Sequence, residues 1–178
     1  MKKILIVLSL IVSSTVLAQD WTTYENKDFN FSVDLPGEPK MVNQEVPTEV
    51  GDLTMNMFMV DASTAEGSSE NLIYMVIHTK YPINQDEVDD SKIETMLDGS
   101  VDGAVGNVQG KLVYANKIEL NGSPGRAAKI EVQGAFMYMN MYLKDSALYA
   151  VQTICLVEND DNDDINKFFD SFKLNKVE

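Results

Sequence analysis

The sequence predicts an α+β domain: a predominantly antiparallel sheet of about seven to nine strands, with two main helices packed on it. Three observations lead to this fold class. Strand-like runs are joined by tight turns, two segments follow helical spacing, and no long crossover separates consecutive strands. Antiparallel strands accept two-residue connections, whereas parallel strands need a crossover of a dozen residues or more.

The first half of the chain contains four of the expected strands. Residues Phe29–Leu35 alternate apolar and polar side chains, as a half-buried strand does. The polar segment Met41–Val50 and the segment Leu53–Val60 flank Gly51-Asp52 and are expected to form a hairpin. Residues Leu72–Thr79 are apolar on both faces, which predicts a central strand covered on both sides.

Two later segments change to helical spacing. Residues Asp86–Val105 place apolar side chains on one stripe, with acidic residues at the start, where a helix dipole favours them. Residues Ile165–Phe172 repeat the apolar spacing. Between them, tight-turn residues separate four strand-like runs and predict an antiparallel meander. These runs are Lys111–Leu120, Arg126–Gln133, Phe136–Leu143 and Ala147–Val157.

The first eighteen residues have the pattern of a secretory signal peptide. A positively charged start precedes the apolar run Ile4–Val12 and the small-residue site Val16–Ala18. The apolar run is too short for a bilayer core, which takes about 20 apolar residues. We expect cleavage after Ala18, which leaves a single domain of residues 19–178 in the periplasm or outside the cell, with no membrane span.

Cysteine usage agrees with that expectation. No cysteine follows the cleavage site directly, so we do not expect a lipoprotein. The chain has one cysteine, Cys155, which cannot form an internal disulfide and lies in an apolar run. We expect a buried, inert thiol, in a domain that relies on packing for its stability.

The chain is strongly acidic. It has 28 acidic and 14 basic residues, a net charge of −14, and loss of Lys2 and Lys3 would make it more negative. A surface of this charge repels phosphate backbones and anionic membranes, so we do not expect the protein to bind nucleic acid. A negative charge of this size keeps a protein soluble, and it would also attract a basic partner protein or a cation.

Three stretches together resemble exported bacterial domains of the PsbP-like superfamily. They are Phe31–Pro39, Asn121–Arg126 and Phe168–Leu174. The resemblance spans nearly all of the expected mature chain, and its motifs are turns and element ends. It implies an α-β-α sandwich around an antiparallel sheet. Proteins of this kind mostly act by binding other molecules, and no catalytic motif carries over to this chain.

Six of the ten methionines form two triplets that alternate along expected strands. The first triplet is Met55, Met57 and Met59, and the second is Met137, Met139 and Met141. Each triplet shares one face of its strand. Thioethers select Cu(I), which makes both triplets candidate metal ligands. The alternative is that these methionines fill irregular space in the core.

An acidic run, Glu158–Asp164, offers oxygen ligands for Ca²⁺ through Asp160, Asp161 and Asp163. It lacks the alternate spacing, the glycine and the closing glutamate of an EF-hand loop. The alternative is a solvated loop that caps the last helix.

The only arginine and the only histidine are further candidates. Arg126 follows Pro124 at the start of an expected strand, so both could contact a partner protein. The alternative for Arg126 is an internal pair with an acidic residue. His78 is alone and cannot form a histidine-rich metal site, so we expect it at the edge of the core with a hydrogen-bonded ring.

These observations predict an exported, non-enzymatic domain that binds a protein or another envelope component. A metal-handling protein that uses the methionine triplets or the acidic run is the alternative. A carboxylate-based hydrolase or isomerase is a third possibility, which needs a buried Asp or Glu in a cleft. No cofactor is expected.

Overall fold

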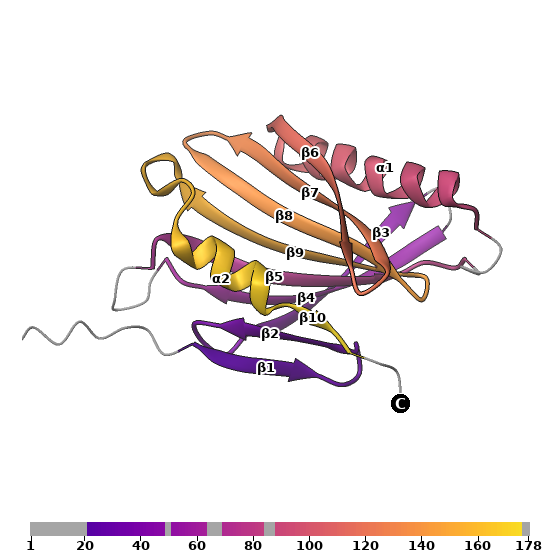
Figure 1. Ribbon diagram of the computed structural model, residues 1–178, viewed down its shortest axis with the longest axis horizontal. Helices are drawn as coiled ribbons and strands as arrows, with labels where there is room; N and C mark the ends of the chain where they lie inside the picture. Colours follow the sequence, from indigo (N-terminus) through magenta and orange to yellow (C-terminus); the bar gives the residue numbers. More distant parts are fainter. Residues whose placement is uncertain (1–20, 49–50, 64–68, 84–87, 176–178) are drawn as a thin grey trace, which may run out of the picture.

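The computed structural model describes residues 21–48, 51–63, 69–83 and 88–175 of the chain. The expected signal peptide, residues 1–18, lies outside the described residues. The described part contains a seven-stranded sheet, a three-stranded sheet and the helices α1 and α2. The α+β fold class predicted from the sequence is therefore confirmed (Figure 1).

The seven-stranded sheet is antiparallel throughout, and its strand order is β3-β4-β5-β9-β8-β7-β6. Its strands are β3 (Lys40–Thr48), β4 (Gly51–Asp61), β5 (Asn71–Lys80), β6 (Lys111–Leu120), β7 (Ser123–Val132), β8 (Ala135–Lys144) and β9 (Ala147–Leu156). The turn between β6 and β7 places Asn121 and Gly122 at positive φ, 52° and 83°, which is the conformation that a tight hairpin requires. The meander predicted for the second half of the chain is thus confirmed.

The three-stranded sheet is a feature that the sequence analysis did not predict. It has the order β1-β2-β10, formed by β1 (Thr22–Asn26), β2 (Phe31–Leu35) and β10 (Lys173–Leu174). β2 is the strand predicted from the alternating pattern, and Phe31, Val33 and Leu35 are fully buried. β1 is polar and β10 has only two residues, so neither carries an apolar pattern of its own.

Helix α1 (Asp90–Val108) begins and ends with defined caps. The Asp89 side chain accepts a hydrogen bond from the Lys92 backbone N–H at 2.8 Å, and Gln109 closes the helix in a left-handed conformation. The helix is three residues longer at its C-terminal end than predicted, because its glycines do not end it. The expected first residue, Asp86, lies outside the described residues.

Helix α2 (Asp163–Ser171) follows a short 3₁₀ turn, Val157–Asn159. Asn162 caps α2 by accepting a hydrogen bond from the Ile165 N–H at 3.1 Å. The same side chain exchanges two hydrogen bonds with Asn71 of β5, at 3.0 and 3.1 Å. These buried amides satisfy each other and fix the start of α2 against the large sheet.

The two helices lie on opposite faces of the large sheet (Figure 1). Alternate residues of β8 separate the faces: Met137, Met139 and Met141 pack toward α1, whereas Tyr138 and Tyr142 point toward α2 and the small sheet. The main contacts of α1 are with β6, β7 and β8. α1 therefore covers only one half of its face, and the half formed by β3, β4 and β5 has no comparable cover.

Within the described part of the chain, no helix is both long enough and apolar enough to span a membrane.

Candidate functional site

A groove of about 500 Å³ lies between α1 and the large sheet. Its helical wall includes Met96, Gly99, Ser100, Gly103, Ala104 and Asn107. Its floor includes Met55, Ile77, Met137, Met139, Met141 and Leu148, and Val46 and Thr48 of β3 extend it to the edge of the sheet. The volume falls within the range of about 300–1,000 Å³ that small-molecule sites have.

The groove is hollow because the helix offers small side chains where it faces β4 and β5. A Cβ atom built on Gly99 or Gly103 would meet no other atom within 4 Å. By contrast, a Cβ atom on Gly110, which follows the C-terminal end of α1, would lie 2.5 Å from the Cγ2 atom of Ile130 in β7. The molecule is thus tightly packed on one side of α1 and open on the other.

Ion pairs hold α1 along its packed side. Arg126 of β7 is only 4% exposed and donates hydrogen bonds to Asp98, at 2.7 Å, and to Glu94. A third guanidinium hydrogen bond reaches the Gly125 carbonyl oxygen at 3.0 Å. The hydrogen bond to Asp98 and then that to Glu94 raise the pKa of Arg126. This is the internal pairing that the sequence analysis gave as the alternative to a partner contact.

Exposed Lys117 also binds Glu94, at 2.7 Å. Its hydrogen bond, followed by that of Arg126, lowers the pKa of the Glu94 carboxyl group. Pro124, the other proposed contact residue, is half-buried in β7 opposite Glu119 of β6. Arg126 and Pro124 thus belong to the packed side of α1, away from the groove.

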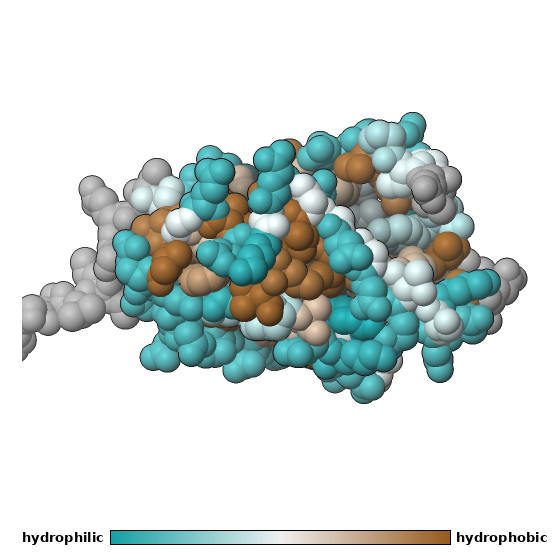
Figure 2. All heavy atoms as spheres, turned by 90° about the horizontal axis from the view of Figure 1, so that it is seen from above, coloured by the Kyte–Doolittle hydropathy of each residue, from teal (hydrophilic) through white to brown (hydrophobic). Residues whose placement is uncertain are grey.

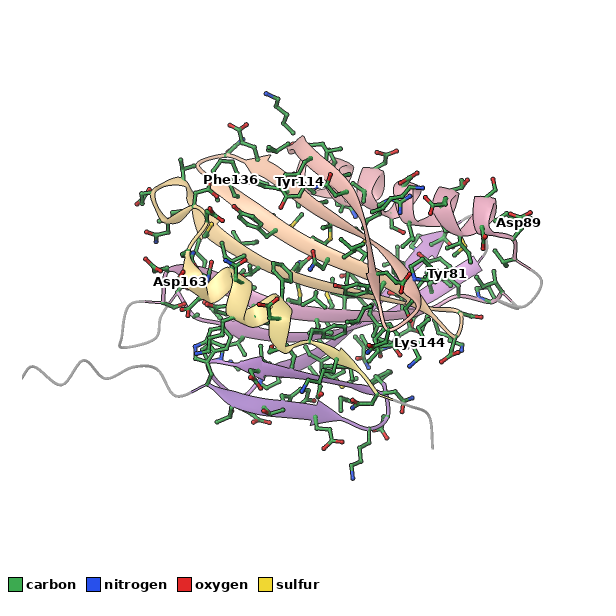
Figure 3. All side chains as sticks on the ribbon, in the orientation of Figure 1. Tyr81, Asp89, Tyr114, Phe136, Lys144 and Asp163 are labelled. Carbon is green, nitrogen blue, oxygen red and sulfur yellow. The ribbon has the colours of Figure 1, made fainter. Side chains whose placement is uncertain are left out.

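Among the residues that the structure describes, no charged side chain lines the groove. Its polar groups are uncharged: Thr48, Thr79 and Tyr81 at one end, and Gln152 and Asn107 toward the other. Figure 3 shows Tyr81 at the end of β5, on the side of the molecule where α1 begins after Asp89. The groove is therefore suited to apolar contact, with neutral hydrogen-bonding groups at its Tyr81 end.

The two methionine triplets have different surroundings. Met137, Met139 and Met141 are 2–3% exposed and pack under α1 with Leu97 and Val101. Met55, Met57 and Met59 of β4 are half-buried on the uncovered half of the same face. Sequence reasoning missed Met75 of β5, which pairs with Met59 across the strands and is also half-buried. The apolar alternation of β5 was the signal that could have identified it.

The acidic run lies at the far end of the molecule from Tyr81 and is held by specific contacts. Both carboxylate oxygens of Asp160 accept hydrogen bonds from the Lys129 ammonium group, at 2.7 and 2.8 Å. The Tyr138 hydroxyl donates to the same carboxylate at 2.6 Å. Asp163 starts α2, and Asp161 is exposed. Asp160 therefore pins the loop before α2 to the sheet.

Burial and hydrogen bonds oppose each other in this cluster. Burial is the largest single effect and lowers the pKa of Lys129, but the hydrogen bonds to Asp160 and Tyr138 and the nearby charges together outweigh burial, and the pKa rises to about 12. Burial, and then the hydrogen bond to Asp160, raise the pKa of Tyr138 to about 12. Burial alone would raise the pKa of Asp160, yet Lys129 holds it below its ordinary value. All three groups are thus fixed in their usual protonation states at neutral pH.

The His78 ring departs from the sequence expectation. It is 8% exposed and lies between Phe29 and Tyr149, whose ring centroids are 4.6 and 5.1 Å away. Its Nδ1 atom is buried without a hydrogen-bond partner among the described residues. The prediction of a hydrogen-bonded ring is therefore wrong for this atom. Burial, followed by the nearby Lys80 charge, lowers the pKa of His78 to about 4. The imidazole is therefore neutral and packs as an aromatic ring.

Apolar side chains also reach the surface outside the groove. Figure 2 shows hydrophobic residues gathered among hydrophilic ones on the face seen from above. Val113 of β6, Leu156 at the end of β9 and Val157 are large apolar residues with 37–50% exposure. None of them lines the groove.

Other candidate chemistry is not assembled in the described ranges. No group of three or more His, Cys, Asp or Glu residues there is placed to hold a metal ion. Cys155 is fully buried, and burial raises the pKa of its thiol. Its location agrees with the buried thiol expected from the sequence.

Comparisons with known proteins bear on the fold. No protein-family model and no curated protein matches the chain. The solution structure of cyanobacterial PsbP (CyanoP) from Synechocystis sp. PCC 6803 superposes with a TM-score of 0.50 at 12% sequence identity. The alignment covers 93% of this chain and 98% of that protein. The chain has a PsbP-like fold.

The PsbP-like likeness confirms the architecture that the resemblance implied. At 12% identity it carries the fold and no residue of a functional site. The groove under α1 is therefore the feature of this chain that bears on its function.

Proposed function

We propose that this chain is a non-enzymatic binding domain that takes an apolar molecule of the cell envelope in the groove under α1. The observation that carries this proposal is a groove of about 500 Å³ whose described lining contains many thioether and aliphatic side chains and no charged group. Pockets of this size and polarity are the usual sites for apolar ligands. Methionine suits such a site because its flexible thioether adapts to irregular shapes.

The same lining supports a binding role over carboxylate catalysis. The third possibility from the sequence needs a buried Asp or Glu in a cleft, and none of the acidic residues in the described part of the chain lines the groove. Glu94 and Asp98 of α1 point instead to Arg126. The export expected from residues 1–18 would place the domain among apolar envelope components.

Filling the groove from the helix gives a direct test. Gly103→Leu puts a large side chain into the groove, because nothing lies within 4 Å of the added Cβ atom. Leucine also has a higher helix propensity than glycine, by nearly 1 kcal/mol, so the variant is expected to be at least as stable as the original chain. Loss of binding would then reflect occlusion and not unfolding.

Gly106→Leu is the matched control, since Gly106 is on the same helix, has the same open space and does not line the groove. The measurement is fluorescence titration with the neutral apolar dye N-phenylnaphthylamine, with melting curves for each variant. We expect Gly103→Leu to weaken binding about tenfold or more and Gly106→Leu to leave it unchanged. If the original chain and both variants bind the dye equally well, the proposal is contradicted. Binding of a protein partner then becomes the main alternative.

A second candidate function is Cu(I) binding by the open methionine triplet. The observation that favours it is Met75, which adds a thioether beside Met59, with Met57 two residues along β4 on the same face. Side chains paired across strands have Cβ atoms about 5 Å apart, so three flexible thioethers can converge.

This candidate is tested by competition with a chromophoric Cu(I) chelator. The triple variant Met57→Leu, Met59→Leu, Met75→Leu keeps the apolar surface but removes the soft ligands, and Met137→Leu is the covered control. Thioethers do not titrate, so the affinity should be the same at acidic and neutral pH. Cu(I) binding that survives the triple variant would exclude this site.

A further inference from the structure

The groove continues into an apolar track on the open half of the sheet. Met55 of β4 and Ile77 of β5 line the groove, and residues two positions further along each strand share their face. These residues are Met57, Met59, Met75 and Ile73, and Val42 of β3 pairs with Met57. We call Met57, Met59, Met75, Ile73 and Val42 the methionine track.

The methionine track is accessible. Val42 is 47% exposed, and the other members are half-buried. None of the five belongs to a core cluster of the described residues. From Leu53 in the groove to Met59 at the track, β4 runs for about 20 Å. The apolar surface is therefore longer than the groove alone.

The shape of the groove decides between two kinds of occupant. The floor from Met137 to Met141 is about 13 Å long. That length is little more than two turns of an α-helix, and a helix so short is marginal in water. A hydrocarbon chain is far narrower than a helix.

Polarity leads to the same choice. An extended peptide in the groove would bury backbone N–H and C=O groups against thioether and aliphatic side chains, which leaves these groups without partners at considerable cost. A hydrocarbon chain has no such groups. The described lining of the groove offers no cation to pair with a carboxylate or phosphate head.

We propose that the ligand is a single-chain lipid with an uncharged head, whose chain passes through the groove and continues over the methionine track. The head lies at the end formed by Thr79 and Tyr81, where neutral groups can hydrogen-bond it. This inference depends on the proposed function, because it assumes that the groove binds an apolar molecule.

A chain-length series tests the inference. Monoacylglycerols of increasing chain length are titrated against the full chain by displacement of N-phenylnaphthylamine. Each buried methylene contributes about fourfold in affinity, so affinity rises until the chain leaves the apolar surface. The double variant Met59→Gln, Met75→Gln makes the track polar, and Met59→Leu, Met75→Leu is its apolar control.

We expect short chains to bind equally well to all three proteins, which shows that the groove is intact. For longer chains, affinity should stop rising earlier in the Gln variant than in the original chain and the Leu variant. The same plateau length in all three would mean that the chain ends inside the groove and would overturn the inference. If fatty acids of the same chain length bind more tightly than the monoacylglycerols, the part of the proposal that gives the ligand an uncharged head is wrong. Failure of every chain to bind would refute the proposed function itself.

Discussion

The two methionine triplets occupy one face of the same sheet and have opposite surroundings. Met137, Met139 and Met141 are buried beneath α1, whereas Met55, Met57 and Met59 are half-buried and belong to none of the core clusters of the described residues. The spacing within each triplet is identical. A period-two pattern therefore identifies a shared face, but what covers that face depends on where a distant helix is fixed.

Arg126 ties α1 to one half of the sheet. It binds Asp98 and Glu94 from β7, next to the edge strand β6, and the small residues Gly99 and Gly103 face the other half. The helix thus buries one triplet at the floor of the groove and leaves the other triplet half-buried. Three experiments examine this contrast between the packed and the open half, and a fourth examines the opposite face of the sheet.

The largest expected effect comes from truncation of a covered methionine. Met139→Ala leaves a cavity under α1 and should lower the free energy of unfolding by about 2–5 kcal/mol. Met57→Ala removes the same atoms from the open half and should cost about 1 kcal/mol or less. Urea unfolding of both variants gives the comparison, and equal losses would show that α1 does not protect its triplet.

Removal of the Arg126 guanidinium group should come next. Arg126→Met deletes buried hydrogen bonds to two carboxylates and is expected to destabilise the fold by about 1.5–3 kcal/mol. Lys117→Met removes the exposed partner of Glu94 and should cost well under 1 kcal/mol. If the two variants melt at the same temperature, the Arg126 contacts do not hold α1 in place.

Acid should destabilise the opposite face of the sheet through His78. Its pKa is about 4 when folded and about 6.5 in the unfolded chain, so the unfolded state takes up the proton first. The contribution of neutral His78 is complete above pH 6.5 and is lost as the pH falls from 6.5 to 4. The loss is on the order of 1–2 kcal/mol once solvent screening is included.

His78→Phe keeps an apolar ring between Phe29 and Tyr149 and removes the titrating group. Urea unfolding between pH 4 and 6.5 should then show a weaker pH dependence in the variant than in the original chain. A variant with an unchanged pH dependence would assign the acid sensitivity to other groups.

The smallest expected effect is a gain. Gly99→Ala adds a methyl group in open space and improves helix propensity, so stability should rise by about 0.5–1 kcal/mol. Gly110→Ala makes the same change just after α1 on the packed side, where the new methyl group would collide with the Ile130 side chain and the Glu131 carbonyl oxygen, and should destabilise the fold. Thermal melting measures both variants. If both substitutions change the melting temperature in the same direction, the contrast between the packed and the open side of α1 is contradicted.

Much of the fold could be predicted from local patterns. Alternation identified β2, the turn at Gly51-Asp52 identified the hairpin that contains β4, and apolar residues on both faces identified β5. Helical spacing, with acidic residues at the start, identified α1 and α2. β1 and β10 were missed because they form by pairing with β2 and not through an apolar pattern of their own. The long-range contacts that create the small sheet have no counterpart in any short window of sequence.

The site was less predictable. The sequence singled out the methionine triplets but could not distinguish them, since the difference lies in the position of α1. Gly99 and Gly103 lower the helix propensity of α1, and the structure shows that they also leave room for the groove. Arg126 was identified as important, and its alternative as an internal ion pair matches its contacts with Glu94 and Asp98.

The uneven cover over the sheet also divides its methionines by their exposure to oxidants. Peroxide reaches the half-buried thioethers of Met57, Met59 and Met75 more readily than those sealed under α1. Oxidation to the sulfoxide turns an apolar side chain into a polar one, and reductases reverse the change. The covered triplet keeps the fold intact under such conditions, while the open surface beside the groove becomes polar and then recovers.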